Sequence, residues 1–272
     1  MRPLHPAFRV AHLRRPRPPL SDRECHHSAR LYWDFNDGYS CVVNVLAKLM
    51  VNSNFNRQLL LTLAGPTEAS RYSAAILSPG DADRAARQRS PKAEQDWQVS
   101  RALLHACRRH TRAACAESLS HSHGHALLAQ APSDWRIGVD MEMIRPRRVL
   151  ALADWACSVG EIEWLRSHSD AGARLRCFYM LWTLKEAFIK AAGLAFPADL
   201  RRYGLDGGVG GPLSLRAPAG AWRARTYFLE PHWIASAVWL PATEGMDEPP
   251  QWRAGPASTL PAVTPLGAWT HR

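Results

Sequence analysis

Residues 137–142, Ile-Gly-Val-Asp-Met-Glu, have apolar side chains at 137, 139 and 141, and acidic side chains at 140 and 142. Successive side chains of a β-strand point to opposite faces, so a strand here buries Ile137 and Val139 and places Asp140 and Glu142 together on the other face. Two carboxylates at this spacing repel each other unless a cation lies between them. The pattern therefore predicts a strand with one face in the core and an acidic pair at a site. An exposed strand whose acidic face meets solvent is the alternative.

Residues 182–190, Trp-Thr-Leu-Lys-Glu-Ala-Phe-Ile-Lys, lie in an apolar run that favours a helix. On that helix Glu186 and Lys190 are four residues apart and share one surface. A third carboxylate and a cation beside the acidic strand suit Mg²⁺ and a phosphate-bearing substrate, because Mg²⁺ prefers oxygen ligands. Lys185 emerges among apolar side chains and requires an anionic partner, which a phosphate can be. An ordinary helix ion pair is the alternative for Glu186 and Lys190.

Residues 120–125, Ser-His-Ser-His-Gly-His, form a third polar cluster. On a single strand, His121, His123 and His125 project from one side, at a spacing that can ligate a transition metal. No fourth ligand is evident nearby, and an alternating polar strand edge also explains the pattern. A phosphate contact by Ser120 and His121 is the other functional interpretation.

Composition limits the class of protein. The chain has 272 residues, of which 46% are apolar and 21% are charged, enough to bury a full core. No apolar run reaches the ~18 residues of a membrane span, so a soluble protein is expected. The six cysteines show no CxxC pair, which fits a reducing compartment, and we expect the cytoplasm. Neither a P-loop nor a GxGxxG motif is present, so nucleotide binding by those devices is not indicated.

The net charge of +10 is concentrated at the start of the chain. Residues 1–30 contain seven arginines against Asp22 and Glu24, and prolines interrupt any helical or strand periodicity. Residues 1–56 are therefore predicted to be an irregular, basic and disordered leader. A nucleic-acid-binding arm is the alternative, because clustered arginines neutralise phosphates regardless of sequence.

Local patterns divide the rest of the chain into two similar halves. Each half reads as a strand, then helices, then one or more strands, which predicts an internal duplication with its boundary near Trp135. We expect an N-terminal lobe over 57–135, a C-terminal lobe with the metal site over 136–241, and a loose Pro- and Gly-rich tail over 242–272. The expected strands are 59–64, 119–131, 135–142, 222–229 and 233–240. One helix is expected to begin at Ser78-Pro79, and further helices are expected over 97–108, 149–167 and 174–192.

Taken together in this order and spacing, Ser-His-Ser, Ile-Gly-Val-Asp-x-Glu and Trp-x-x-Lys-Glu-Ala-x-x-Lys resemble the 4′-phosphopantetheinyl transferase superfamily. The likeness covers about residues 57–241 and is to the two-lobed type that activates peptide and polyketide synthases. Residues 157–161, Cys-Ser-Val-Gly-Glu, also resemble the family's intervening Phe-Ser-x-x-Glu element, with Cys157 in place of Phe.

The resemblance implies an α+β fold of two small lobes related by a pseudo-two-fold axis. Each lobe is then an antiparallel sheet packed with helices, and coenzyme A binds between the lobes. It further implies transfer of phosphopantetheine from coenzyme A to a serine of an apo acyl, peptidyl or aryl carrier protein. Adenosine 3′,5′-bisphosphate is the released product. Membrane and nucleic-acid partners are not expected.

The resemblance also implies roles for individual residues. Asp140, Glu142 and Glu186 hold Mg²⁺ against the pyrophosphate, and Glu186 is the favoured general base, with Lys190 as its rival. Further contacts to coenzyme A then come from Lys185 and Lys190 at phosphate oxygens, from Ser120 and His121 at the 3′-phosphate end, and from Arg84 at a basic family position.

Two departures from the family pattern concern coenzyme A binding. The family usually has a longer segment, with a Gly-Lys-Pro turn, where this chain has only residues 109–119. One basic contact is then absent or replaced by Arg109 or Arg112. Residues 93–96, Ala-Glu-Gln-Asp, are also more acidic than the family's usual run before Trp97. Just beyond the acidic strand, Arg145, Arg147 and Arg148 form either a contact for an acidic carrier helix or a solvated basic turn.

Overall fold

The computed structural model describes residues 58–110, 114–194, 199–207, 211–242 and 248–271. These residues belong to one compact unit, Phe55–Arg272. The basic leader predicted for 1–56 lies outside the described residues, as does Arg112. No helix among the described residues has the length and apolar character that a membrane span needs.

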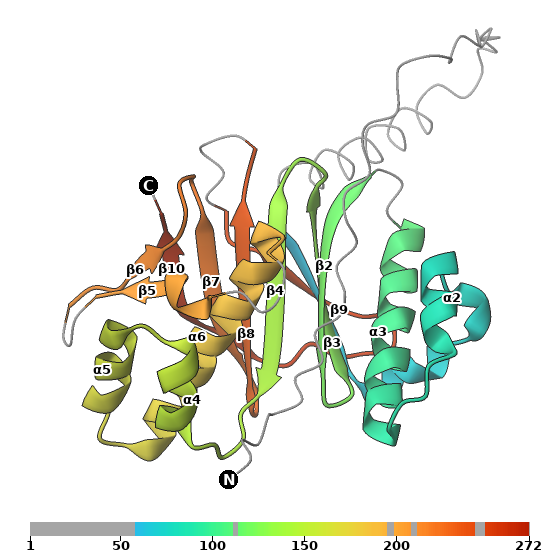
Figure 1. Cartoon of the computed structure of the whole chain (residues 1–272). Coiled ribbons are helices and arrows are strands. Elements are labelled where there is room, and N and C mark those ends of the chain that lie inside the picture. Colours follow the sequence, from blue (N-terminus) through green and yellow to red (C-terminus); the bar gives the residue numbers. More distant parts are fainter. Residues whose placement is uncertain (1–57, 111–113, 195–198, 208–210, 243–247, 272) are drawn as a thin grey trace, which may run out of the picture. The chain divides into compact units, whose positions relative to one another are not determined.

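The first sheet has the strand order β2-β3-β1-β9 (Figure 1). β1 pairs antiparallel with β3 and parallel with β9, and β2 pairs antiparallel with β3. The strand predicted over 59–64 is confirmed as β1. The bounds are Leu60–Ala64 for β1, Cys115–Ser122 for β2, His125–Pro132 for β3 and Gln251–Ala254 for β9.

The second sheet has the order β10-β7-β8-β4, and all its pairs are antiparallel. The strands predicted over 135–142, 222–229 and 233–240 are confirmed as β4, β7 and β8. A separate pair is formed by β5 and β6. The bounds are Arg136–Met143 for β4, Gly204–Asp206 for β5, Ser214–Arg216 for β6, Arg223–Leu229 for β7, Trp233–Leu240 for β8 and Val263–Thr270 for β10.

The tail is more ordered than its composition predicts. It supplies β9 to the first sheet and β10 to the second, so the expectation of a loose tail is wrong for these two segments. The reason is apolar burial: Trp252 and Val263 pack against the core shared by the two sheets, and Trp269 packs against the helical core. The prolines and glycines obscure this pattern, and the register of β10 shifts between Pro265 and Gly267.

The α-helices begin at the residues that favour capping. Ser78 caps α2 by accepting a hydrogen bond from the Asp81 amide, and Asp170 caps α6 in the same way. Ser158 and Glu161 form a capping box at α5. The predicted 149–167 helix is two helices, because Cys157 is extended between them. The bounds are Pro79–Ala85 for α2, Pro91–His110 for α3, Val149–Ala156 for α4, Val159–Ser167 for α5 and Ala171–Ala192 for α6, with 3₁₀ turns at Pro66–Arg71, Ala74–Ile76 and Leu200–Arg202.

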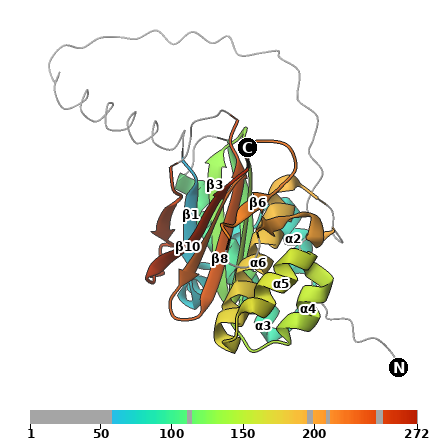
Figure 2. The ribbon, with the colours of Figure 1, turned by 90° about the vertical axis from the view of Figure 1, so that its left-hand side faces the viewer.

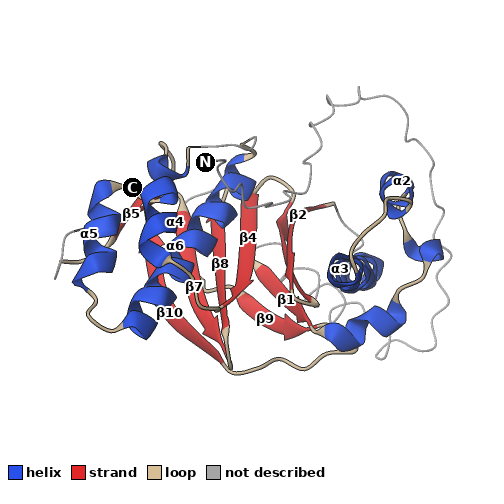
Figure 3. Cartoon of the chain, turned by 60° about the horizontal axis from the view of Figure 1, so that its bottom comes forward, coloured by secondary structure: helices blue, strands red, loops and turns tan. Residues whose placement is uncertain are grey.

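The two sheets share an apolar core, and helices cover their other faces. Side chains from β1 and β3 pack together with Ile137, Val139 and Met141 of β4 and with residues of β7 and β8. α3 packs on the first sheet, whereas α4, α5 and α6 lie on one side of the second (Figures 2 and 3). The predicted burial of Ile137 and Val139 is therefore confirmed.

The strand predicted over 119–131 is a hairpin. β2 and β3 pair on either side of His123 and Gly124, whose φ angles are 50° and 73°. This two-residue turn places His121 and His125 on different strands, so the expectation that three imidazoles project from one side is wrong. Gly124 is also the kind of residue that a positive φ favours in a hairpin turn.

The α+β class is confirmed by these antiparallel sheets and their helices. The first sheet takes β1, β2 and β3 from residues 57–135, the second takes β4, β7 and β8 from residues 136–241, and each gains one strand from the tail. The division into two lobes stays a prediction, as does the pseudo-two-fold relation between them.

Candidate functional site

Gly138 brings β4 into direct contact with α6. A Cβ at this position would lie 2.0 Å from the carbonyl oxygen of Ala187 and 2.5 Å from the amide nitrogen of Ala191. The helix backbone therefore rests on the strand where a side chain would otherwise be. Asp140 and Glu142 follow at intervals of two residues and share this face of β4. The acidic pair thus lies on the side that α6 covers.

Gly138→Ala is expected to destabilise the protein by about 1–3 kcal/mol, because α6 must move away from β4 to admit the methyl group. Urea unfolding checks this value. Gly160→Ala is the matched control, since nothing lies within 4 Å of a Cβ built there. Equal stability of the two variants would contradict the close packing of α6 on β4.

Asp140 and Lys190 meet although they are 50 residues apart. The Lys190 ammonium donates to Asp140 Oδ1 at 2.8 Å and to the Val139 carbonyl at 2.9 Å. Ser120 Oγ donates to the same Asp140 oxygen at 2.9 Å. The other oxygen, Oδ2, is buried and has no protein partner. One oxygen of this carboxylate is therefore held, and the other is left for a ligand.

Glu142 and Glu186 have perturbed carboxyl groups. Burial and, to a smaller extent, the charge of Asp140 together raise the pKa of each to about 7. A hydrogen bond from Ser122 opposes the rise at Glu142, and the Lys190 charge opposes it at Glu186. The negative charge of Asp140 thus acts on both glutamates, as expected if β4 and α6 form one acidic site.

The donor chemistry of this site fits a hard divalent cation. The unpartnered Oδ2 of Asp140 is an oxygen ligand, and a cation would relieve the repulsion that raises the pKa of Glu142 and Glu186. The arrangement is not a ready-made metal centre. Across the described residues, no group of three or more His, Cys, Asp or Glu side chains is placed to hold a metal ion. Lys190 and two serines hold the carboxylates instead, and Mg²⁺ binding here remains a proposal.

Ser120 and His121 are adjacent to the acidic site but have different surroundings. Ser120 is buried, and its hydroxyl donates to Asp140 while accepting from the Met141 amide. A hydroxyl has one proton, so a phosphate contact by Ser120 would compete with its bond to Asp140. The His121 side chain, in contrast, is exposed. Loss of water nevertheless lowers the pKa of its imidazole, with opposition from Asp96 and a further lowering by Lys190.

Lys185 points away from the acidic site. It is fully buried and forms an ion pair of 2.8 Å with Glu161 Oε2. It also donates to the carbonyls of Leu200 and Tyr203. Glu161 Oε1 in turn lies 3.1 Å from Arg216. The anionic partner that the sequence requires for Lys185 is therefore Glu161, within the protein, rather than a phosphate, and the predicted contact of Lys185 with coenzyme A is not supported.

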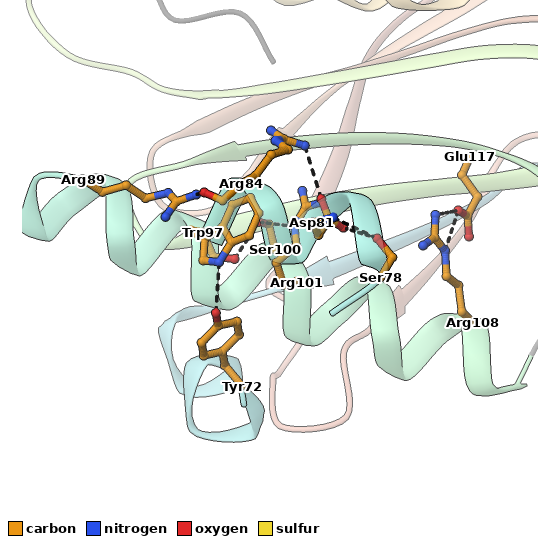
Figure 4. Close-up of polar contacts among 10 residues, drawn as sticks. All are labelled: Tyr72, Ser78, Asp81, Arg84, Arg89, Trp97, Ser100, Arg101, Arg108 and Glu117. Atoms are coloured by element: carbon orange, nitrogen blue, oxygen red, sulfur yellow. Dashed lines mark hydrogen bonds and ion pairs between the residues drawn. The ribbon is translucent and has the colours of Figure 1, made fainter. Parts of the chain in front are cut away.

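Arg84 belongs to a cluster of arginines around Trp97, shown in Figure 4. The guanidinium carbons of Arg84, Arg89 and Arg101 lie 5.3, 4.1 and 4.7 Å from the centre of the indole ring. Asp81 is the carboxylate of the cluster, 3.3 Å from Arg84 and 2.9 Å from Arg101. An aromatic ring under several cations, with one anion, is suited to an anionic ligand. Of these three arginines, the sequence analysis named only Arg84 as a candidate contact. The packing of arginines around Trp97 has no periodic signal in the sequence that could have revealed the other two.

A second basic surface is a groove of about 490 Å³ between the starts of α4 and α6. Arg147, Arg148 and Arg174 line it, together with apolar residues that include Val149 and Leu175. The prediction named the first two of these arginines. Arg145 instead has its backbone amide bonded to the hydroxyl of Tyr179. The groove combines positive charge with an apolar floor.

One comparison with known proteins covers the part of the chain that holds the acidic site. The family model described as the 4′-phosphopantetheinyl transferase superfamily matches residues 136–236. A Synechocystis sp. protein named "Putative 4'-phosphopantetheinyl transferase slr0495" is 33% identical over 86 residues, which are 31% of this chain and 34% of that relative. The chain thus matches about a third of the length of that relative. The matched family region includes β4 and α6, whose contact forms the acidic site. Over residues 136–236, the chain is therefore similar to the 4′-phosphopantetheinyl transferase superfamily.

Proposed function

We propose that this protein transfers 4′-phosphopantetheine from coenzyme A to a serine of an apo carrier protein, in a Mg²⁺-dependent reaction. The observation that carries the proposal is the contact of Asp140 on β4 with Lys190 on α6, inside the segment that matches the superfamily. The charge of Asp140 also helps to raise the pKa of Glu142 and of Glu186, which supports one shared acidic site.

The acidic site suits displacement at a phosphorus atom. Charge builds on the oxygens of the pyrophosphate as the bond to the leaving group breaks, and cations stabilise that charge. Asp140, Glu142 and Glu186 would hold the Mg²⁺ that supplies this stabilisation. Lys190, the cation already at the site, is available to phosphate oxygens once its bond to Asp140 is exchanged.

Glu186 is the favoured base for the serine hydroxyl. A general base works best when its pKa is near the operating pH, and burial raises the pKa of Glu186 to about 7. Lys190 is the rival. In the structure Lys190 acts as a hydrogen-bond donor, to the Val139 carbonyl and to Asp140 Oδ1.

The two basic surfaces suit the two substrates. The arginine cluster on Trp97 offers guanidinium groups to a phosphate of coenzyme A, and His121 is exposed near the charges of Lys190 and Arg101. The groove with Arg147 and Arg148 offers positive charge and apolar surface to an acidic helix of the carrier.

The test is incubation with coenzyme A, Mg²⁺ and a panel of apo carrier proteins, read by intact mass. The expected result is a carrier that gains one phosphopantetheine group on serine, with release of adenosine 3′,5′-bisphosphate. Release of that nucleotide without modification of any carrier would instead indicate the alternative of a metal-dependent phosphohydrolase. Salt-sensitive nucleic-acid binding that depends on residues 1–56 would indicate the non-catalytic alternative.

Arg147→Glu combined with Arg148→Glu is expected to raise KM for the carrier at least tenfold while leaving KM for coenzyme A unchanged, because charge reversal repels an acidic helix. Both residues are exposed, so the fold should tolerate the change. Steady-state kinetics with each substrate varied checks this. Arg202→Glu combined with Arg253→Glu, both exposed and outside the groove, is the control for net charge. An equal effect of this control pair would contradict docking in the groove.

A further inference from the structure

β2 is one edge strand of the first sheet, β4 is one edge strand of the second, and the two strands lie next to each other (Figure 1). They are not paired as neighbouring strands in either sheet. An edge strand has amide groups without strand partners, and such groups must find other acceptors when they are buried. Between these two edges the acceptors are serine side chains.

Ser118, Ser120 and Ser122 occupy alternate positions of β2, and we call them the serine row. Alternation places them on one face of the strand. Ser118 Oγ accepts from the Val139 amide at 3.0 Å, and Ser120 Oγ accepts from the Met141 amide at 3.2 Å. Both contacts run from the serine row to the backbone of β4.

Two members of the row also contact the acidic pair. Ser120 donates to Asp140 Oδ1 at 2.9 Å, and Ser122 donates to Glu142 Oε2 at 3.1 Å. The spacing of two residues in the row thus matches the spacing of two residues in the pair. Both hydroxyls are buried, where a hydrogen bond to a carboxylate is stronger than in water.

The effect on each carboxylate is orientation. Ser120 and Lys190 hold Oδ1 of Asp140, while Oδ2 remains without a protein partner. Ser122 holds one oxygen of Glu142, and its own hydroxyl lies 2.9 Å from His123 Nδ1. A carboxylate fixed through one oxygen presents the other in a defined direction, which lowers the cost of ordering it around a ligand.

We propose that Ser120 and Ser122 are positioning residues that orient Asp140 and Glu142 for a divalent cation, whereas Ser118 only joins the two sheet edges. This inference rests on the proposed function. Partners that hydrogen-bond a metal-binding carboxylate typically change metal affinity by about 10- to 100-fold. Ser118 serves as an internal comparison, because it makes the same kind of backbone contact without touching a carboxylate.

The experiment measures Mn²⁺ binding by the loss of the free-ion electron paramagnetic resonance signal, with saturating coenzyme A and without a carrier. Ser122→Thr and Ser122→Val form a matched pair, because the two side chains have nearly the same shape and only threonine keeps the hydroxyl. Ser118→Ala is the control for the join between the sheets. Thermal unfolding of each variant confirms that it is folded before binding is measured.

The expected result is that Ser122→Val weakens Mn²⁺ binding about 10- to 100-fold, while Ser122→Thr and Ser118→Ala stay within about threefold of the unchanged protein. Equal affinities of Ser122→Val and Ser122→Thr would overturn the positioning role and leave the proposed function intact. No Mn²⁺ binding by the unchanged protein would overturn both the cation site and this inference. If all the variants bind Mn²⁺ equally well and also transfer phosphopantetheine to a carrier, the positioning role is wrong and the proposed function stands.

Discussion

Glu186→Gln is expected to lower kcat for phosphopantetheine transfer by at least about a hundredfold. Glutamine keeps the shape of the side chain but can neither accept the serine proton nor carry a negative charge to a cation. Burial and the charge of Asp140 raise the pKa of Glu186 to about 7, so the loss removes a group that is poised to exchange a proton near neutral pH. Initial rates at saturating coenzyme A and carrier measure the change.

Glu163→Gln on α5 is the control for this variant, because Glu163 is exposed and belongs to neither of the two elements that form the acidic site, β4 and α6. Its kcat is expected to equal that of the unchanged protein. The Glu186 variant must also be folded, which thermal unfolding shows. A folded Glu186→Gln protein with undiminished transfer would remove Glu186 from both the base role and the ligand role.

The local patterns around the site could be predicted because each is short. The alternation of Ile137, Val139 and the acidic pair is a property of one strand, and the apolar runs over 222–229 and 233–240 each lie within one strand. Both appear in the structure as expected. Gly138 belongs to the same group, since a glycine amid an alternating strand indicates close approach of another element.

The remaining features depend on partners that are distant along the chain. The pairing of β1 with β9 brings together segments at opposite ends of the described chain, and apolar burial of Trp252 decides it rather than local propensity. The serine row is visible as Ser-x-Ser-x-Ser, but its meaning depends on which strand edge it faces. The His123-Gly124 turn was missed because the histidine alternation resembles a continuous strand.

For Lys185, the sequence predicted that an anionic partner is needed but not which group it is. Its position in an apolar stripe correctly indicated that it needs an anionic partner. The stripe carries no information on which anion that is. Glu161 lies in a different helix and reaches Lys185 only because α5 and α6 pack together. Lys185 and Glu186 are therefore adjacent in sequence but have different partners. Lys185 forms a structural ion pair with Glu161, whereas Glu186 lies near Asp140 in the acidic site.

Lys185→Met is expected to lower the free energy of unfolding by about 3–5 kcal/mol, because it leaves the buried Glu161 carboxylate with less compensation. The side-chain exposures are 0% for Lys185 and 2% for Glu161, so water cannot replace the lost partner. Urea unfolding measures the effect. Arg202→Met is the control: its pair with Asp199 spans 3.8 Å with side-chain exposures of 76% and 59%, and its loss should have an effect of at most about 1 kcal/mol.

A double-mutant cycle separates the ion pair from the general cost of altering the core. Glu161→Gln alone leaves the Lys185 ammonium buried with only carbonyl partners, so it too is expected to be strongly destabilising. Adding Lys185→Met to Glu161→Gln should then cost much less than Lys185→Met alone, because the charge that it would strand is already gone. Additive losses would mean that the two side chains stabilise the protein independently. In that case Glu161 would act mainly through Arg216 and the Leu205 amide, which it also contacts, and the pair with Lys185 would not fix α6.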